Sequence, residues 1–117
     1  MNGYKLSTLF YILCVTSIHE SGAITLERDN NWLILHDERV PTGKIRINYL
    51  EAYSRPNSTD TDWHDTTIGH KTELINISND QKNMQLSCIL SDGVIIKHDI
   101  QSLEDEVTFE IKAHNPT

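Results

Sequence analysis

The residues 54–70, SRPNSTDTDWHDTTIGH, gather carboxylate, imidazole and aromatic side chains between two segments that alternate like β-strands. Oxygen ligands at alternate positions, Asp60 and Asp62 with Asp65, could hold a hard cation such as Ca²⁺. The segment lacks the central glycine and the terminal glutamate of the twelve-residue calcium loop. Calcium is therefore one interpretation of these carboxylates among several.

The same segment has two further interpretations. His64 and His70 with a carboxylate could bind a transition metal, although this spacing is common by chance. A long loop that is solvated and holds no metal is the interpretation we favour. Loops of this length inside compact domains are usually functional or disordered, so 54–70 is where we expect a site.

Trp63 is the one large apolar residue among these polar neighbours. It could pack on the sheet, or it could offer a flat face to a sugar ring, whose hydroxyls suit nearby carboxylates and amides. Arg46 and Asn48 share the polar face of a predicted strand, and Tyr53 follows them. A saccharide site would then comprise Trp63, Asp60, Asp62, His64, Arg46, Asn48 and Tyr53. The alternative is that the polar strand face with Arg46 and Asn48 faces water and binds no ligand.

The segments that carry or flank these candidate site residues alternate apolar and polar residues with a period of two, as β-strands do. No stretch shows sustained helical spacing. Apolar and polar residues alternate in KIRINYLEAY and again around Cys88, and Ser91-Asp92-Gly93 is a hairpin signal. The predicted strands are 31–37, 44–53, 70–78, 83–91, 93–100 and 105–113. We expect an all-β antiparallel sandwich of about six or seven strands with the last strand at an open edge. This sandwich could also form part of a larger supersandwich.

Residues 1–23 have the three parts of a secretory signal peptide. Lys5 is the positive n-region, 6–18 is an apolar stretch too short to span a membrane, and Ser21-Gly22-Ala23 fits a cleavage site. Removal of these 23 residues from the 117 leaves 94, which suits a single domain over 24–117. We expect a secreted or periplasmic protein without membrane contact after cleavage. Either Asn115-Pro116 ends a complete small domain, or the domain is truncated and a further domain follows Thr117; we favour the second interpretation.

Charge and cysteine content restrict the function further. The formal net charge is −7, which argues against nucleic acid as a partner. Cys88 is the single cysteine after residue 23, so no internal disulfide can form. It shares a strand face with Met84, Leu86 and Leu90, which predicts a buried thiol, and His98 on an apolar face is expected to be a hydrogen-bonded core or edge residue.

The segments WLILHDERVPTGKIRINYLEAYSRPNSTDTDWHDTTIGHKTEL, MQLSCILSDGVIIKHDI and DEVTFEIKAHNPT resemble exported bacterial proteins of uncharacterised function, of the planctomycete type. The closing pattern, in which a strand is followed by DGV, a second strand, DEV and a last strand that ends in AHNPT, also resembles the galactose mutarotase-like β-supersandwich of carbohydrate-active proteins. That resemblance implies a carbohydrate ligand and a larger sheet. No catalytic residue of the group maps onto a motif here.

Three functions are therefore carried forward. The first is an exported, non-catalytic module for carbohydrate recognition or an accessory role. The second is the N-terminal part of a carbohydrate-active enzyme such as a lyase, glycosidase or epimerase. The third is a cell-envelope structural or interaction domain with no small ligand. We favour a non-enzyme for this chain on its own, with a saccharide as partner and with no cofactor unless the carboxylates bind Ca²⁺.

Overall fold

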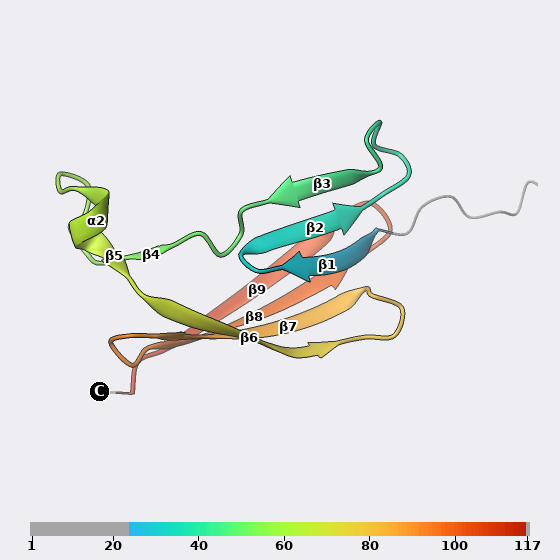
Figure 1. The fold of residues 1–117 in the computed structure, drawn as a ribbon. Helices are drawn as coiled ribbons and strands as arrows, with labels where there is room; N and C mark the ends of the chain where they lie inside the picture. Colours follow the sequence, from blue (N-terminus) through green and yellow to red (C-terminus); the bar gives the residue numbers. More distant parts are fainter. Residues whose placement is uncertain (1–23, 117) are drawn as a thin grey trace, which may run out of the picture.

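A computed structural model describes residues 24–116 of the chain, so the predicted signal peptide at 1–23 and residue 117 lie outside the described residues. The described part is built from antiparallel sheets of three, two and four strands. The three-stranded sheet lies across the four-stranded sheet, and the two-stranded one extends from one end (Figure 1). The prediction of an all-β antiparallel, sandwich-like fold is confirmed.

The three-stranded sheet has the order β1-β2-β3, and both of its connections are turns. Asp29 pairs with Trp32, so only two residues join the first two strands, and Asn30 there has a φ of 52°. Asparagine tolerates this left-handed region better than most residues, which suits it to a tight turn. The strands are β1 (Thr25–Asp29), β2 (Trp32–His36) and β3 (Lys44–Ile47).

The four-stranded sheet is a meander in which each strand pairs with the next along the chain. The hairpin signal at Ser91-Asp92-Gly93 is confirmed, since Gly93 has a φ of 94° in the turn that follows Leu90. The sheet order places the last strand at an edge, as the sequence predicts. Its strands are β6 (His70–Ile77), β7 (Asn83–Leu90), β8 (Ile95–Ser102) and β9 (Val107–His114).

The two larger sheets bury a common apolar core, which explains the alternation in the sequence. The face of the four-stranded sheet toward the three-stranded one is called the inner face, and its opposite the outer face. We call the three-stranded sheet the upper sheet and the four-stranded sheet the lower sheet. Inner-face residues of β7 and β8 meet Leu26 and Leu33 of the upper sheet. The buried core cluster is Leu26, Leu33, Leu50, Ile68, Met84, Leu86, Cys88, Leu90, Ile96 and Ile100.

Two segments differ from the sequence prediction. The predicted strand 44–53 ends at Ile47, because the chain turns there and buries Leu50 between the sheets. Residues 25–29 form a strand that we did not assign from the sequence, although Thr25–Asp29 alternates and precedes a turn. The core cluster and the described strands belong to residues 24–116, so experiments on residues 24–117 retain every core contact described here.

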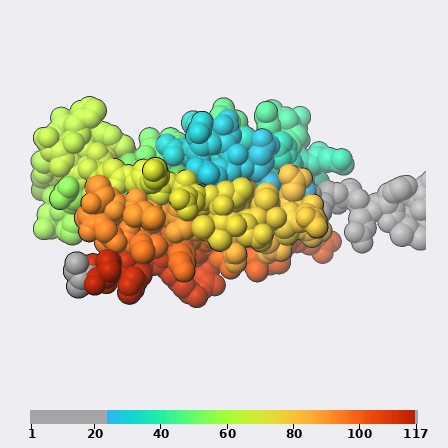
Figure 2. All heavy atoms as spheres, turned by 60° about the horizontal axis from the view of Figure 1, so that its bottom comes forward, coloured from blue at the N-terminus to red at the C-terminus, as the bar shows by residue number. Residues whose placement is uncertain are grey.

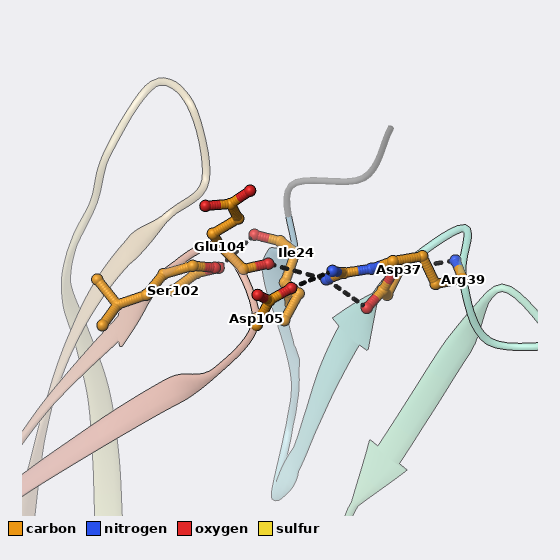
Figure 3. Close-up of polar contacts among 7 residues, drawn as sticks. Ile24, Asp37, Arg39, Ser102, Glu104 and Asp105 are labelled. Carbon is orange, nitrogen blue, oxygen red and sulfur yellow. Dashed lines mark hydrogen bonds and ion pairs between the residues drawn. The ribbon is translucent and has the colours of Figure 1, made fainter. Parts of the chain in front are cut away.

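One end of the sandwich is closed by polar contacts between turns (Figure 3). Arg39 lies in the turn between β2 and β3. Its guanidinium donates a hydrogen bond to Asp105 Oδ1 (2.6 Å) and another to the carbonyl oxygen of Glu104 (2.9 Å), and both of these residues lie in the turn between β8 and β9. It also donates to Asp37, which lowers the pKa of that carboxyl. These contacts orient the two sheets, although exposed ion pairs contribute little to stability.

The first strand is also tied to the lower sheet. The buried hydroxyl of Ser102 donates to the carbonyl of Ile24 over 2.6 Å (Figure 3). The backbone N–H of Leu26 donates to the carbonyl of Gln81, in the turn between β6 and β7, over 2.8 Å. Both contacts join the two sheets through β1.

Candidate functional site

A groove of about 330 Å³ runs over the outer face of the four-stranded sheet. Side chains from all four strands line it, and most are polar or charged. We call it the outer-face groove; the residues that line it are Ile75, Gln85, Leu86, Ser87, Lys97, His98, Asp99, Glu110 and Lys112.

The strand period places the polar members of this set on one face. Gln85 and Ser87 occupy alternate positions between the buried residues of β7, and Lys97 and Asp99 do the same in β8. The apolar member has a separate cause. The register of β6 shifts between Leu74 and Asn76, and the intervening Ile75 is 58% exposed. A β-bulge of this kind redirects a side chain, so Ile75 contributes an apolar wall to the groove.

The charges in the groove form rows of equal sign across two strands. Lys97 lies opposite Lys112, and Asp99 lies opposite Glu110, in the register of β8 and β9. Like charges at directly opposed positions repel one another. Along β9 the charges alternate, and Lys112 Nζ lies 2.7 Å from Glu110 Oε1, which raises the pKa of the lysine. The groove therefore offers cationic and anionic groups in equal number.

Four of the predicted site residues lie in the loop at the far end of the molecule (Figure 1). A single helical turn, α2 (Trp63–Thr66), occupies part of it, between the short paired strands β4 (Tyr53–Ser54) and β5 (Thr67–Ile68). Asp62 caps this turn by accepting a hydrogen bond from the backbone N–H of His64 at 2.9 Å. Trp63 is 53% exposed, and Asp60 and His64 are also exposed.

The remaining predicted site residues lie elsewhere in the structure. The Arg46 guanidinium, on β3, lies 4.5 Å from the centroid of the Trp32 ring. Asn48 follows β3 and is exposed. The Tyr53 hydroxyl turns inward and contacts His98. Figure 2 shows the 55–66 loop in yellow-green at one end and the three-stranded sheet, in blue to green, farther along, so the structure does not gather all seven residues into one site.

A polar cluster that sequence reasoning did not assemble lies inside the sandwich. Both ring nitrogens of His98 have partners, because Nδ1 lies 2.7 Å from the Tyr49 hydroxyl and Nε2 lies 2.9 Å from the Tyr53 hydroxyl. Cys88 Sγ lies 3.7 Å from the same Nε2. The prediction of a hydrogen-bonded His98 and a buried Cys88 is confirmed, but their contact joins residues ten positions apart on neighbouring strands.

Burial determines the ionisation of this cluster. It lowers the pKa of His98 and raises the pKa of Tyr49 to about 12. The neutral imidazole has one donor and one acceptor nitrogen, so one tyrosine hydroxyl donates to the ring and the other accepts from it. Cys88 is fully buried, so the pair of thiol and imidazole is enclosed by the core. The cluster fixes the positions of Tyr49 and Tyr53 between the sheets.

The described residues contain no group of three or more histidine, cysteine, aspartate or glutamate side chains that could hold a metal ion. Of the three aspartates proposed as calcium ligands, Asp62 is engaged as the cap of α2. Across residues 24–116, no helix has the length and apolar character needed to cross a membrane.

Fold and site define the chain as an all-β, sandwich-like protein with a polar groove on the outer face of its larger sheet. Comparisons with protein-family models, with curated proteins and with solved structures each gave no match.

Proposed function

We propose that the chain is an exported, non-catalytic recognition module that binds a saccharide in the outer-face groove. The observation that carries this proposal is the groove itself, in which amide, hydroxyl, carboxylate and ammonium groups project side by side from neighbouring strands. A saccharide hydroxyl both donates and accepts hydrogen bonds, so it can use all of these groups. The exposed side chain of Ile75 supplies an apolar surface for the C–H groups of a sugar ring.

The charge of the groove favours a ligand that is neutral overall. Lys97 and Lys112 balance Asp99 and Glu110, so neither an anionic nor a cationic polymer gains a consistent attraction. The net charge of −7 on the whole chain adds repulsion for nucleic acid. A neutral, hydroxyl-rich chain that lies across the strands is the ligand class that meets both conditions.

The buried cluster gives no support to an enzymatic alternative. A thiol beside an imidazole is the arrangement of a cysteine nucleophile and its base. Here the thiol of Cys88 is fully buried, and burial disfavours the imidazolium form of His98 that would stabilise a thiolate. A substrate would have to open the core to reach them, so we assign the cluster to the packing of the sandwich.

Glycan-array binding followed by titration calorimetry on residues 24–117 tests the proposal. Gln85→Ala removes a groove amide and is expected to weaken binding roughly two- to tenfold, as the loss of one hydrogen bond would. Gln101→Ala is the matched control, because Gln101 is an exposed glutamine of the same sheet that does not line the groove. Equal effects of the two variants would contradict the groove as the site.

Trp63→Ala separates the groove from the loop predicted by the sequence. Trp63 is half-exposed on a capped turn, so its loss should leave the stability of the sandwich nearly unchanged. If Trp63→Ala abolishes saccharide binding while Gln85→Ala does not, recognition lies at the loop. If the unmodified protein binds no glycan, saccharide recognition is wrong, and a structural or interaction role of the envelope becomes the better proposal.

A further inference from the structure

The edge strand β9 presents apolar side chains on its inner face that the upper sheet does not cover. Phe109 is 40% exposed and Ile111 is 56% exposed, although both alternate with polar residues as core positions do. Tyr49, which follows β3, reaches Phe109 with a ring-centroid distance of 5.3 Å, and the cover ends there. Within residues 24–116 no strand pairs with β9 on the side away from β8.

The backbone of β9 is also available for pairing on that side. Leu103 N donates to Glu106 O across the turn that joins β8 and β9. Hydrogen-bonded pairs recur at every second residue of an antiparallel ladder. The residues of β9 that bond to β8 are therefore Thr108, Glu110, Lys112 and His114. The N–H and C=O groups of Phe109, Ile111 and Ala113 consequently point toward the open edge.

We propose that a second copy of this chain pairs with β9, antiparallel and centred on Ile111, to form a symmetric dimer with one continuous eight-stranded sheet. In this register Ile111 faces its own equivalent, and Phe109 faces Ala113 of the other copy, a large residue against a small one. The open-edge N–H and C=O groups of both strands then bond to each other. The exposed inner-face side chains become buried along the same seam.

The charges of the outer face select this register. Around Ile111, Glu110 of one copy lies opposite Lys112 of the other, and the reverse pair follows by symmetry. The like-charged row of Asp99 and Glu110 then continues into a row of two lysines, so that the repulsion within each protomer is offset across the seam. A register centred on Glu110 or on Lys112 would instead set like charges face to face. Alternating charge at an edge can discourage pairing, but among the registers centred on residues 110 to 112, the one centred on Ile111 sets opposite charges face to face at both symmetric positions.

The dimer would also place two outer-face grooves on one surface. Residues paired across an antiparallel seam project to the same side of the sheet. Glu110 and Lys112 line the groove of each copy, so the two grooves would lie next to each other at the seam. This inference rests on β9 and its charges and does not depend on saccharide binding.

Sedimentation equilibrium of residues 24–117 is the first test, and a reversible dimer is expected. A protein that stays monomeric to its limit of solubility overturns the proposal and leaves the edge for another chain or for a further segment. Ile111→Pro removes an N–H at the seam, while the bonds of β9 to β8 use other residues, and it should give a monomer that is folded by circular dichroism.

Charge variants test the register and remain informative if the proline variant unfolds. Glu110→Lys should raise the dimer dissociation constant roughly tenfold, because it sets lysines face to face at both symmetric positions. The double variant Glu110→Lys/Lys112→Glu restores opposite charges across the seam and should restore the dimer. A double variant as weak as the single one would overturn the register.

Cross-linking gives a readout that depends on the register alone. Ile111→Cys should form an intermolecular disulfide under mild oxidation, because the Cα atoms of a hydrogen-bonded antiparallel pair lie about 5.5 Å apart. Phe109→Cys is the matched control and should not cross-link to itself, because it faces Ala113 of the other copy. Cross-linking of Phe109→Cys in place of Ile111→Cys would show a different seam.

Discussion

The Nε2 atom of His98 lies 3.7 Å from the sulfur of Cys88, inside a core that leaves Cys88 without solvent exposure. The two residues come from neighbouring strands of one sheet, and the imidazole also contacts two tyrosine hydroxyls. Protonation of the buried ring would turn its acceptor nitrogen into a donor, so one tyrosine hydroxyl would have to reorient and the core would have to hold a charge. The reactivity of the Cys88 thiol and the protonation of His98 should therefore both depend on the free energy of unfolding.

Thiol labelling of residues 24–117 reports on this burial, since Cys88 is the single cysteine in that part of the chain. We expect a thiol reagent such as dithionitrobenzoate to react slowly with the native protein and quickly in denaturant. The native rate should rise when denaturant first populates unfolded molecules. Fast labelling without denaturant would contradict the placement of Cys88 in the core.

His98 predicts a loss of stability in mild acid. Burial lowers its pKa in the folded state, while in the unfolded chain it titrates near 6.5. Between these two values the unfolded state binds the extra proton, so the free energy of unfolding falls as pH decreases below 6.5 and is fully retained above it. The slope from this residue is at most about 1.4 kcal/mol per pH unit.

Urea melts at pH 7.5 and at pH 5.5 measure this loss. His64→Gln is the control, because His64 is exposed in the loop and lies outside the buried cluster. His98→Gln should flatten the pH dependence while lowering stability at both pH values. A wild-type stability that is the same at the two pH values would show that His98 is not held neutral by the core.

Two isoleucines of the four-stranded sheet test which face is buried. Ile100 on β8 is fully buried, whereas Ile89 on β7 is 48% exposed on the outer face. Ile100→Ala should lower the free energy of unfolding by about 2–5 kcal/mol, as for other large-to-small core changes. Ile89→Ala should cost less than about 1 kcal/mol. Equal costs in denaturant melts would contradict the assignment of inner and outer faces.

The N-terminal residue of any exported form tests the prediction of a signal peptide. The apolar stretch and the small residues before Ile24 predict cleavage after Ala23. Mass spectrometry of protein recovered outside the cytoplasm should then find Ile24 as the first residue. An exported form that retains Met1 would exclude this cleavage.

The sequence was sufficient to predict the class of fold because side chains alternate with a fixed period of two in a strand. Met84, Leu86 and Cys88 were assigned to the core on that basis, and all are buried. Phe109 and Ile111 alternate with polar residues in the same way on β9, yet they are half-exposed. The alternation identifies the face of a strand, but the width of the opposing sheet decides whether that face is covered.

The candidate site was less predictable, since it depends on pairings distant in sequence. The polar residues of the groove were visible as the alternate positions of three segments, but only the register brings Lys97, Asp99 and Glu110 together. The apolar wall at Ile75 needs a bulge that no turn residue announces. The loop around Trp63 drew attention through its composition, and the structure shows that Asp62 within it caps a turn.

The tie between β1 and the lower sheet bears on the order in which the chain can fold. Ile24 receives its hydrogen bond from Ser102, 78 positions later, and Leu26 bonds to Gln81. The hairpins of the meander close short loops and can form early, whereas the contacts of β1 require a long loop to close. We therefore expect β1, the first of the described strands, to find its partners in the lower sheet last. Until then the inner faces of β7 and β8 lack part of their cover, and this is the interval in which the chain is most exposed to aggregation.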